Sequence, residues 1–303
     1  MLARVPVIPR FDLERESLPS HVWTIVLTGD APPITGLPLR ARGGRVATRW
    51  PATGPIAQRA ARTLERASRL APAGQTIAVL TRRHAAAWAP KLAAAPHARR
   101  VVQPVYRGRA AELLLPLLKI ARRDPSATVI VLPADQRVDY DARFLRCVGR
   151  AVRAVALRPD LPILVGAHPE TAVRDGWIEP GAPIEGLEDL AVHEVKDFVD
   201  GASAAEQRRL FDAGGLTSTS ILVGRAGGLR ALAARELPEV LEALEPLEGA
   251  FDRPEESLLG EAVYESMPQA SLAPLERAPG LAVLALPDAV WGAPEREALL
   301  LAS

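Results

Sequence analysis

Cysteine is almost missing from this sequence. The single cysteine, Cys147, excludes a disulfide within the chain and a thiolate metal cluster, and its predicted helical setting suggests core filling. Long apolar runs are missing too, since none approaches the roughly 18 residues of a membrane-spanning helix. Residues 1–20 combine proline with mixed charge and carry no apolar secretory signal. We therefore expect a cytoplasmic protein without a membrane partner.

Lysine is scarce as well, because the only lysines are Lys91, Lys119 and Lys196. The other basic residues are arginines, a bias that, with the abundant alanine, is typical of a GC-rich bacterial genome. The 37 basic residues are balanced by 36 acidic ones, and no basic stripe alternates with aromatic side chains. Nucleic acid is therefore not an expected partner.

The sequence has enough apolar residues for a large core, with 48% hydrophobic residues in a chain of 303. Three segments, Val22–Leu27, Thr76–Thr81 and Thr128–Leu132, are short, apolar and rich in β-branched residues, which indicates buried strands. Amphipathic helices are expected at residues 56–70 and 84–92. This alternation predicts an α/β fold whose mixed, mostly parallel sheet has these three strands at its centre and helices on both faces.

The chain is expected to form one main domain. Residues 1–20 are interpreted as an N-terminal extension and residues 21–303 as the domain. A polar link near residues 251–257 predicts that the part from about residue 250 packs on the rest of this domain.

An acidic residue follows the third of these strands. Pro133 stops the strand, and Asp135 then lies just past its carboxyl end, where open α/β sheets bind ligands. This position favours a metal-binding acid. The alternative is that Asp135 only caps the helical segment that follows it, since Asp is common before amphipathic helices.

The same stretch resembles a known family. Gln103-Pro104, Arg107-Gly108, and the run Val131-Leu132-Pro133-Ala134-Asp135 are similar to the "QPxxRGTA…VLPSDH" core of the sugar-1-phosphate nucleotidyltransferases, and among them to the mannose-1-phosphate guanylyltransferases. The similarity extends, with gaps, from about Trp23 to Glu297.

The resemblance implies a Rossmann-like (GT-A-type) fold and the reaction of a nucleoside triphosphate with a sugar-1-phosphate to give a nucleotide sugar and pyrophosphate. It also implies that Gln103, Pro104, Arg107 and Gly108 bind the nucleotide and that Asp135 is catalytic and holds magnesium.

The loop after the first strand departs from the family's glycine-rich "AGGxGTRL" pattern. Gly29 matches a nucleotide-binding glycine, but Asp30, Pro32, Pro33 and Ile34 stand where glycines, a threonine and an arginine are expected. Proline lacks an N–H group and fixes φ, and an acid repels an anion, so this loop should bind triphosphate poorly.

Two further reactive positions are also replaced. Where the family has a lysine in "PKQF", only Arg45 or Arg49 could supply positive charge, with a different geometry. Near the C-terminus, Trp291-Gly292 aligns with the family so that Val290 stands at the second metal-binding aspartate. Asp288, two residues away, is the candidate for a displaced catalytic ligand.

The expected sugar-binding residues come from three segments. Gly176 and Glu179 lie in a stretch that resembles "RPETGYGYIEPG", although a β-hairpin that needs a glycine in its turn is an alternative. Around "VxxFVEKPD", one register places Asp197 on the family's glutamate and another places Lys196 on its lysine. Ser218 stands where an asparagine would contact the sugar.

Two functional hypotheses follow. The first is a nucleotidyltransferase with impaired or lost catalysis, in which magnesium binds weakly or not at all. The second is a catalytically inactive module that binds a nucleotide or nucleotide sugar and acts in regulation or protein interaction. A protein partner or a homodimer stays open, as does a purely structural role.

Overall fold

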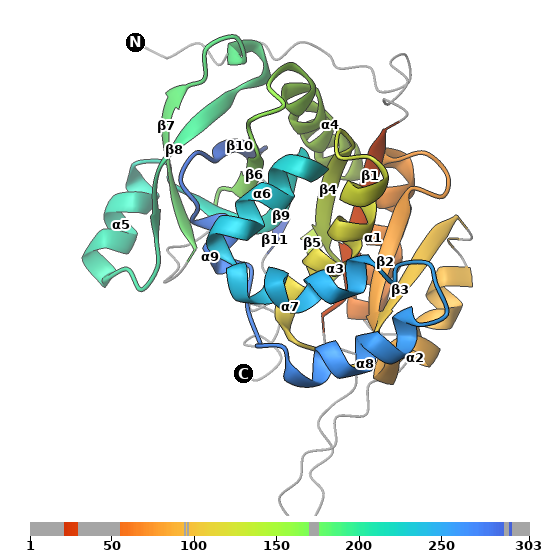
Figure 1. Cartoon of the computed structure of the whole chain (residues 1–303). Helices are drawn as coiled ribbons and strands as arrows, with labels where there is room; N and C mark the ends of the chain where they lie inside the picture. Colours follow the sequence, from red (N-terminus) through yellow and green to blue (C-terminus); the bar gives the residue numbers. More distant parts are fainter. Residues whose placement is uncertain are drawn as a thin grey trace, which may run out of the picture.

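The structure, a computed structural model, describes residues 21–29, 55–93, 95, 97–169, 176–287 and 291–292. Figure 1 labels its helices and strands. Their bounds, in chain order, are β1 Val22–Leu27, α1 Pro55–Leu70, β2 Thr76–Thr81, α2 Arg82–Ala93, β3 Ala98–Gln103, α3 Gly108–Arg123, β4 Thr128–Pro133, β5 Arg137–Val138, α4 Asp141–Leu157, β6 Ile163–Ala167, β7 Trp177–Pro183, η1 Glu188–Leu190, β8 Val192–Val199, α5 Ala204–Asp212, β9 Leu216–Arg225, α6 Ala226–Glu236, α7 Pro238–Glu248, α8 Glu256–Ser266, α9 Ala273–Glu276, β10 Ala282–Leu286 and β11 Trp291–Gly292. Among the described residues, no helix combines the length and the apolar composition needed to cross a membrane.

Parallel strands form one part of the main sheet, in the order β3-β2-β1-β4. Side chains of β1 point alternately to opposite faces, as the pleat requires. Val22 and Val26 pack in the same core cluster as α1 and α4, whereas Ile25 and Leu27 pack with α3. Because both faces are covered, β1 is buried along its whole length, which explains why its sequence is apolar apart from Thr24.

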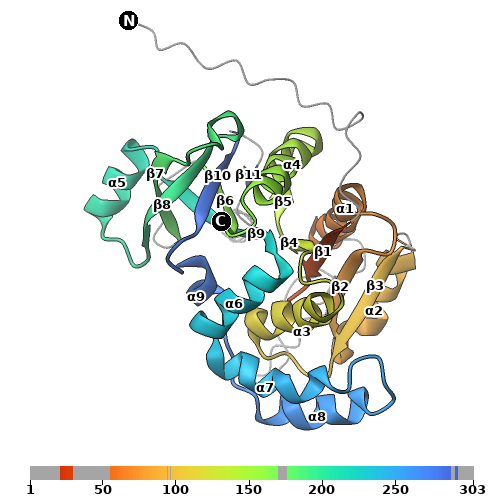
Figure 2. The same cartoon turned by 45° about the horizontal axis from the view of Figure 1, so that its top comes forward.

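The other part of the sheet closes on itself. Strand β9 pairs antiparallel with β4, β6 and β7, while β10 pairs with β6 and β8, and β8 pairs with β7. The strands β9, β6, β10, β8 and β7 therefore form a closed ring, a five-stranded β-barrel within the 9-stranded mixed sheet. The pairs Trp177↔Thr217 and Ile178↔Leu216 close this ring. Figure 2 shows the parallel strands at one end of the molecule and β7 and β8 at the other.

The expected Rossmann-like (GT-A-type) fold, with a mixed, mostly parallel sheet and helices on both faces, is therefore wrong. Strands β2, β1 and β4 are adjacent and parallel, but they lie toward the β3 end of the sheet instead of at its centre. The physical reason is the antiparallel strand β9, whose amino end pairs with β7 and whose later residues pair with β4 and β6. A strand's own composition does not reveal such distant partners.

Helix α3 lies at the junction of the sheet and the later helices. Its sequence is apolar on nearly all sides, which is typical of a helix buried in a core. One face packs on β1, and the rest is covered by α6 and α7, with α8 beyond them (Figures 1 and 2). Glu112 is the only acidic residue in this helix, and its side chain is buried.

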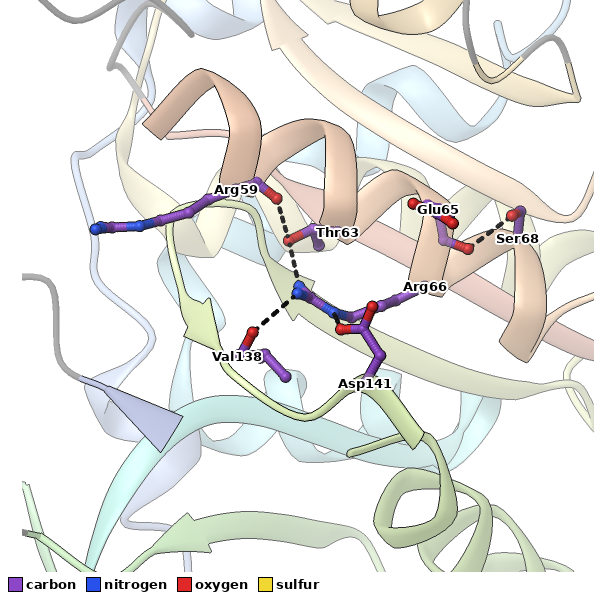
Figure 3. A network of polar contacts seen from close by, with 7 residues as sticks. All are labelled: Arg59, Thr63, Glu65, Arg66, Ser68, Val138 and Asp141. Carbon is purple, nitrogen blue, oxygen red and sulfur yellow. Dashed lines mark hydrogen bonds and ion pairs between the residues drawn. The ribbon is translucent and has the colours of Figure 1, made fainter. Parts of the chain in front are cut away.

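Arg66 joins α1 to the start of α4. Figure 3 shows its guanidinium pointing toward Asp141 and Val138. Its Nε donates to Asp141 Oδ1 at 2.7 Å, and its Nη2 donates to the Val138 carbonyl at 3.4 Å. The Phe144 ring lies 5.7 Å from the guanidinium carbon. Since Val138 belongs to β5, which pairs with β11, this arginine also supports the small second sheet.

Replacing Arg66 should destabilise the fold. The Arg66→Ala variant loses the ion pair, the hydrogen bond to Val138 and the packing on Phe144. We expect its free energy of unfolding to fall by about 2 kcal/mol. The expected fall is small because the Asp141 side chain is 40% exposed and is solvated by water in the variant. Urea denaturation measures it, with exposed Arg69→Ala in the same helix as the control. Equal midpoints for the two variants would contradict this role.

Candidate functional site

The candidate site lies where β1 and β4 end. The last residues of these strands, Leu27 and Pro133, are opposite each other in the parallel pair, and the Ala134 amide donates to the Leu27 carbonyl at 2.8 Å. Gly29 and Asp135 therefore leave the sheet at the same edge. The carboxyl ends of parallel strands are the usual ligand-binding edge of an α/β structure.

Glu112 of α3 reaches this edge at the end of the first strand. Its Oε1 accepts a hydrogen bond from the Gly29 amide at 2.8 Å, while its Oε2 is buried without a hydrogen-bond partner among the described residues. Burial raises the pKa of Glu112 to about 7, and the amides of Gly29 and Thr28 and the charge of Arg109 reduce that rise. Glu112 therefore titrates near neutral pH.

Arg109, in the first turn of α3, pairs with Asp135. Its Nη2 lies 2.9 Å from Asp135 Oδ2, and both side chains are partly exposed. Burial lowers the pKa of Arg109, but the charges of Asp135 and Glu112 outweigh that effect and the pKa is raised. The other carboxylate oxygen, Asp135 Oδ1, is buried and has no hydrogen-bond partner in the described part of the chain.

Tyr264 of α8 extends the polar row away from Glu112. Burial raises the pKa of its phenol, a hydrogen bond with the neighbouring Gln103 side chain lowers it, and the charge of Glu112 raises it further. Gln103 Nε2 and Tyr264 Oη are both buried, and beyond this mutual contact neither makes a hydrogen bond to a described residue. A row of buried polar groups with unused bonding capacity thus runs from Gln103 through Tyr264 and Glu112 to Asp135.

Arg107 and Gly108, two of the expected nucleotide-binding residues, fasten the C-terminal segment to α3. The Arg107 guanidinium donates to the carbonyls of Tyr264 at 2.6 Å and Glu265 at 2.7 Å, which lie in the last turn of α8. Gly108 has a φ of 89°, and a Cβ there would lie 2.0 Å from the Ala270 carbonyl oxygen. Both residues therefore have a structural task, and their nucleotide binding stays a prediction.

Pro104 lies in the wall of a cavity of about 310 Å³ between β3 and α8. The cavity is lined by Tyr264 and by two basic residues, Arg82 and Arg253, among others. Arg82 pairs with Glu261 at its rim, and this carboxylate raises the pKa of the guanidinium. The volume of the cavity is at the lower end of the range for small-molecule pockets, about 300 to 1,000 Å³.

Gly176 and Ser218, two of the expected sugar-binding residues, meet where the barrel closes. The Ser218 amide donates to the Gly176 carbonyl at 2.8 Å, and Ser218 Oγ donates to Glu276 of α9, also at 2.8 Å. The Gly176 amide donates to Asp200, at 2.6 Å. Gly176 has a φ of 75°, so the turn interpretation of this glycine also fits its backbone.

Glu179 and Asp197 form a separate group on β7 and β8, where they are opposite each other. Glu179 pairs with Lys196 and, at 3.5 Å, with Arg209; Lys196 is the first cause of its lowered pKa. The exposed Asp197 accepts only the neighbouring Phe198 amide among the described contacts. Binding of a sugar by these residues stays a prediction.

Several expected positions lie outside the described residues. They are Asp30, Pro32, Pro33, Ile34, Arg45, Arg49, Asp288 and Val290. In contrast, Arg109, Glu112 and Tyr264 were missed by the sequence interpretation. A signal existed for Glu112, since it stands in the apolar middle of this helix, between Ala111 and Leu113, where a buried acid needs a partner or a proton.

The described residues are a poor donor set for magnesium. They contain no group of three or more His, Cys, Asp and Glu side chains that could hold a metal. Asp135 offers one carboxylate, and Arg109 already occupies one of its oxygens. Magnesium prefers octahedral oxygen coordination with few cations nearby, so the resident arginine opposes it.

No protein-family model matches the chain, and no curated protein matches its sequence. Solved structures do match. A mannose-1-phosphate geranyltransferase from Thermus thermophilus is 22% identical, with a TM-score of 0.69 over 90% of this chain and 75% of that one. A mannose-6-phosphate isomerase from Helicobacter pylori is 13% identical, with a TM-score of 0.67 over 90% of this chain and 100% of that one. At these identities the likeness shows a shared fold.

The pKa of Glu112 predicts how stability changes with pH. Its folded-state value of about 7 exceeds the ordinary 4.5, so its contribution is fully present below pH 4.5 and is lost as the pH rises through 7. In wild type the free energy of unfolding should fall between pH 5 and pH 8. In Glu112→Gln, whose side chain is neutral at every pH, this fall should be smaller by about 3 kcal/mol. Urea denaturation at four pH values measures this. Exposed Glu65→Gln is the control, and parallel curves for wild type and Glu112→Gln would contradict the assignment.

Proposed function

We propose that this protein is a nucleotidyltransferase-like protein, related to the mannose-1-phosphate guanylyltransferases, that binds a guanine nucleotide or nucleotide sugar and has impaired or lost catalysis. The motif residues from Gln103 to Asp135 support this proposal, and so does the fold shared with two proteins named for mannose-phosphate chemistry. The shared fold alone does not specify a ligand.

One observation carries the ligand part of the proposal. Glu112 Oε2 and Asp135 Oδ1 are buried and have no hydrogen-bond partner among the described residues, and Gln103 Nε2 and Tyr264 Oη are buried with no described partner except each other. Most buried polar groups in native proteins are bonded, and each unsatisfied group costs about 1–3 kcal/mol. A row of such groups at the ligand-binding edge is therefore best explained by a polar ligand, or by water that the ligand displaces.

The cavity beside Pro104 extends this row. A nucleotide carries both an apolar base and an anionic chain, and the cavity offers an apolar wall together with Arg82 and Arg253. Tyr264 lines the cavity and its buried side chain also neighbours Glu112, so it lies between the cavity and the edge of β1 and β4. We place the nucleotide in this cavity, against Pro104, with the buried Gln103 beside Tyr264.

The arrangement of the charges supports the proposed impairment of catalysis. In nucleotidyl transfer a sugar-phosphate oxygen attacks the α-phosphorus of the triphosphate, and pyrophosphate leaves. The step needs donors and cations aimed at the phosphates. Here the Gly29 amide is bonded to Glu112 and the Arg109 guanidinium to Asp135. Both groups are already engaged, which also supports the alternative of a catalytically inactive binding or protein-interaction module.

Binding can be tested by calorimetry with GDP-mannose, GDP and GTP, each with and without magnesium. We expect at least one ligand to bind, with little dependence on magnesium. Gln103→Leu keeps the bulk of the side chain but removes its amide, so affinity should fall about tenfold, as for the loss of a buried hydrogen bond.

The matched control is Gln207→Leu on α5, whose amide donates to the Ala202 carbonyl far along the chain from this row. The Gln207→Leu variant should bind the nucleotide with the affinity of the wild type. Failure of every nucleotide to bind would refute the proposed function and favour a purely structural role. Strong binding of GTP that requires magnesium would refute the assignment of the loop after β1.

Turnover separates the impaired enzyme from the ordinary one. Purified protein with GTP and mannose-1-phosphate, or with other triphosphate and sugar-phosphate pairs, should release pyrophosphate well below about 1 per second, the lower end of common enzyme rates. A coupled pyrophosphate assay measures it. A rate near that value would show that catalysis is intact, and complete absence of turnover with measurable nucleotide binding would favour the inactive module.

A further inference from the structure

We propose that Arg109 and Glu112 are built-in counter-ions: the Arg109 guanidinium holds the place of a metal cation on Asp135, and the Glu112 carboxylate holds the place of an anion on the Gly29 amide. The site then needs neither a divalent metal nor a phosphate group to balance its charges. This inference goes beyond the proposed function, because it concerns the charges of the site itself and does not require a nucleotide.

The cation half rests on the position of Arg109. Asp135 follows β4 at the ligand-binding edge, and its Oδ2 lies 2.9 Å from Arg109 Nη2. Such a charge-assisted hydrogen bond is strong in a partly buried setting. A magnesium ion on the same carboxylate would have to displace the guanidinium or lie beside it, and either arrangement is opposed by repulsion between the two cations.

The anion half rests on the position of Glu112. The Gly29 amide lies just past the first strand, and the glycine has a φ of 68°. Backbone amides exposed at such turns are common binding groups for phosphate. Here Glu112 Oε1 accepts this amide at 2.8 Å. A phosphate oxygen could reach the same amide only by displacing a buried carboxylate.

Arg109 is the positive centre of a small charged cluster. Arg109 interacts with both Asp135 and Glu112, while the two carboxylates repel each other. Tyr106, at the turn before α3, is a further neighbour of the guanidinium. Removing Arg109 therefore leaves the Asp135 carboxylate without its counter-ion and removes the repulsion that a divalent cation would meet there.

The cation half is tested by titrating magnesium chloride into nucleotide-free protein, with sodium chloride at matched ionic strength as the reference. Wild type and Arg109→Lys should show no saturable binding at millimolar magnesium. Arg109→Met removes the charge and keeps most of the stem, so saturable magnesium binding should appear, at least about tenfold tighter than the weakest binding that the titration of wild type can detect. Adding Asp135→Asn to Arg109→Met should abolish it. Arg123→Met, at the exposed end of the same helix, is the control and should behave as wild type.

Two outcomes would overturn the cation half. One is wild-type magnesium binding that Asp135→Asn removes, because Arg109 would then not block the carboxylate. The other is that the Arg109→Met variant folds but binds magnesium no more tightly than the wild type does. If Arg109→Met does not fold, the comparison of wild type with Asp135→Asn still decides the question.

The anion half is tested with inorganic tripolyphosphate. Glu112→Ala frees the Gly29 amide and removes a negative charge, so tripolyphosphate should bind about tenfold tighter than to wild type. Exposed Glu242→Ala on α7 is the control and should leave the affinity unchanged. Equal affinities for Glu112→Ala and wild type would overturn this half. None of these titrations contains a nucleotide, so their failure is distinct from failure of the proposed function.

Discussion

The hydrogen bond between Glu112 and the Gly29 amide is the interaction on which the candidate site depends. A carboxylate on a helix that is apolar on nearly all sides can remain in the core only if its charge is compensated or its proton is retained. This chain does both in part: the Gly29 amide and Arg109 stabilise the anion, while burial raises the pKa to about 7. The bond also connects the residue that follows β1 to α3. Arg109, one turn earlier in α3, donates a hydrogen bond to Asp135, which follows β4. One buried acid therefore organises the edge where the parallel strands end.

Helix α3 carries this arrangement because it is packed on several sides at once. The sheet lies on one side, and α6 and α7 cover another. At its amino end, Arg107 binds the last carbonyls of α8, and Gly108 allows the Ala270 backbone to approach closely. The residues that resemble a nucleotide motif thus hold the C-terminal segment over the row of buried polar groups.

Local pattern was enough to predict the elements but not their assembly. Val22–Leu27 and Thr76–Thr81 are strands with the predicted bounds, because burial on both faces demands a largely apolar run. The closure of the barrel was not predictable. It depends on the pairing of Trp177 with β9, far along the chain, and the composition of a strand does not identify the strand with which it pairs. Asp135 was found from its place after a strand. Arg109 and Glu112 were not, because their roles arise only when β1, β4 and α3 come together.

The candidate site is built on the hydrogen bond that the Gly29 amide donates to the Glu112 carboxylate. The most direct measurement is a pH titration of the Gly29 amide resonance by NMR between pH 5 and pH 8. We expect a change in its ¹H and ¹⁵N shifts with a midpoint near pH 7, where Glu112 loses its proton. The change should be absent in Glu112→Gln. A Gly29 resonance that stays constant over this range, or that titrates identically in Glu112→Gln, would contradict this assignment.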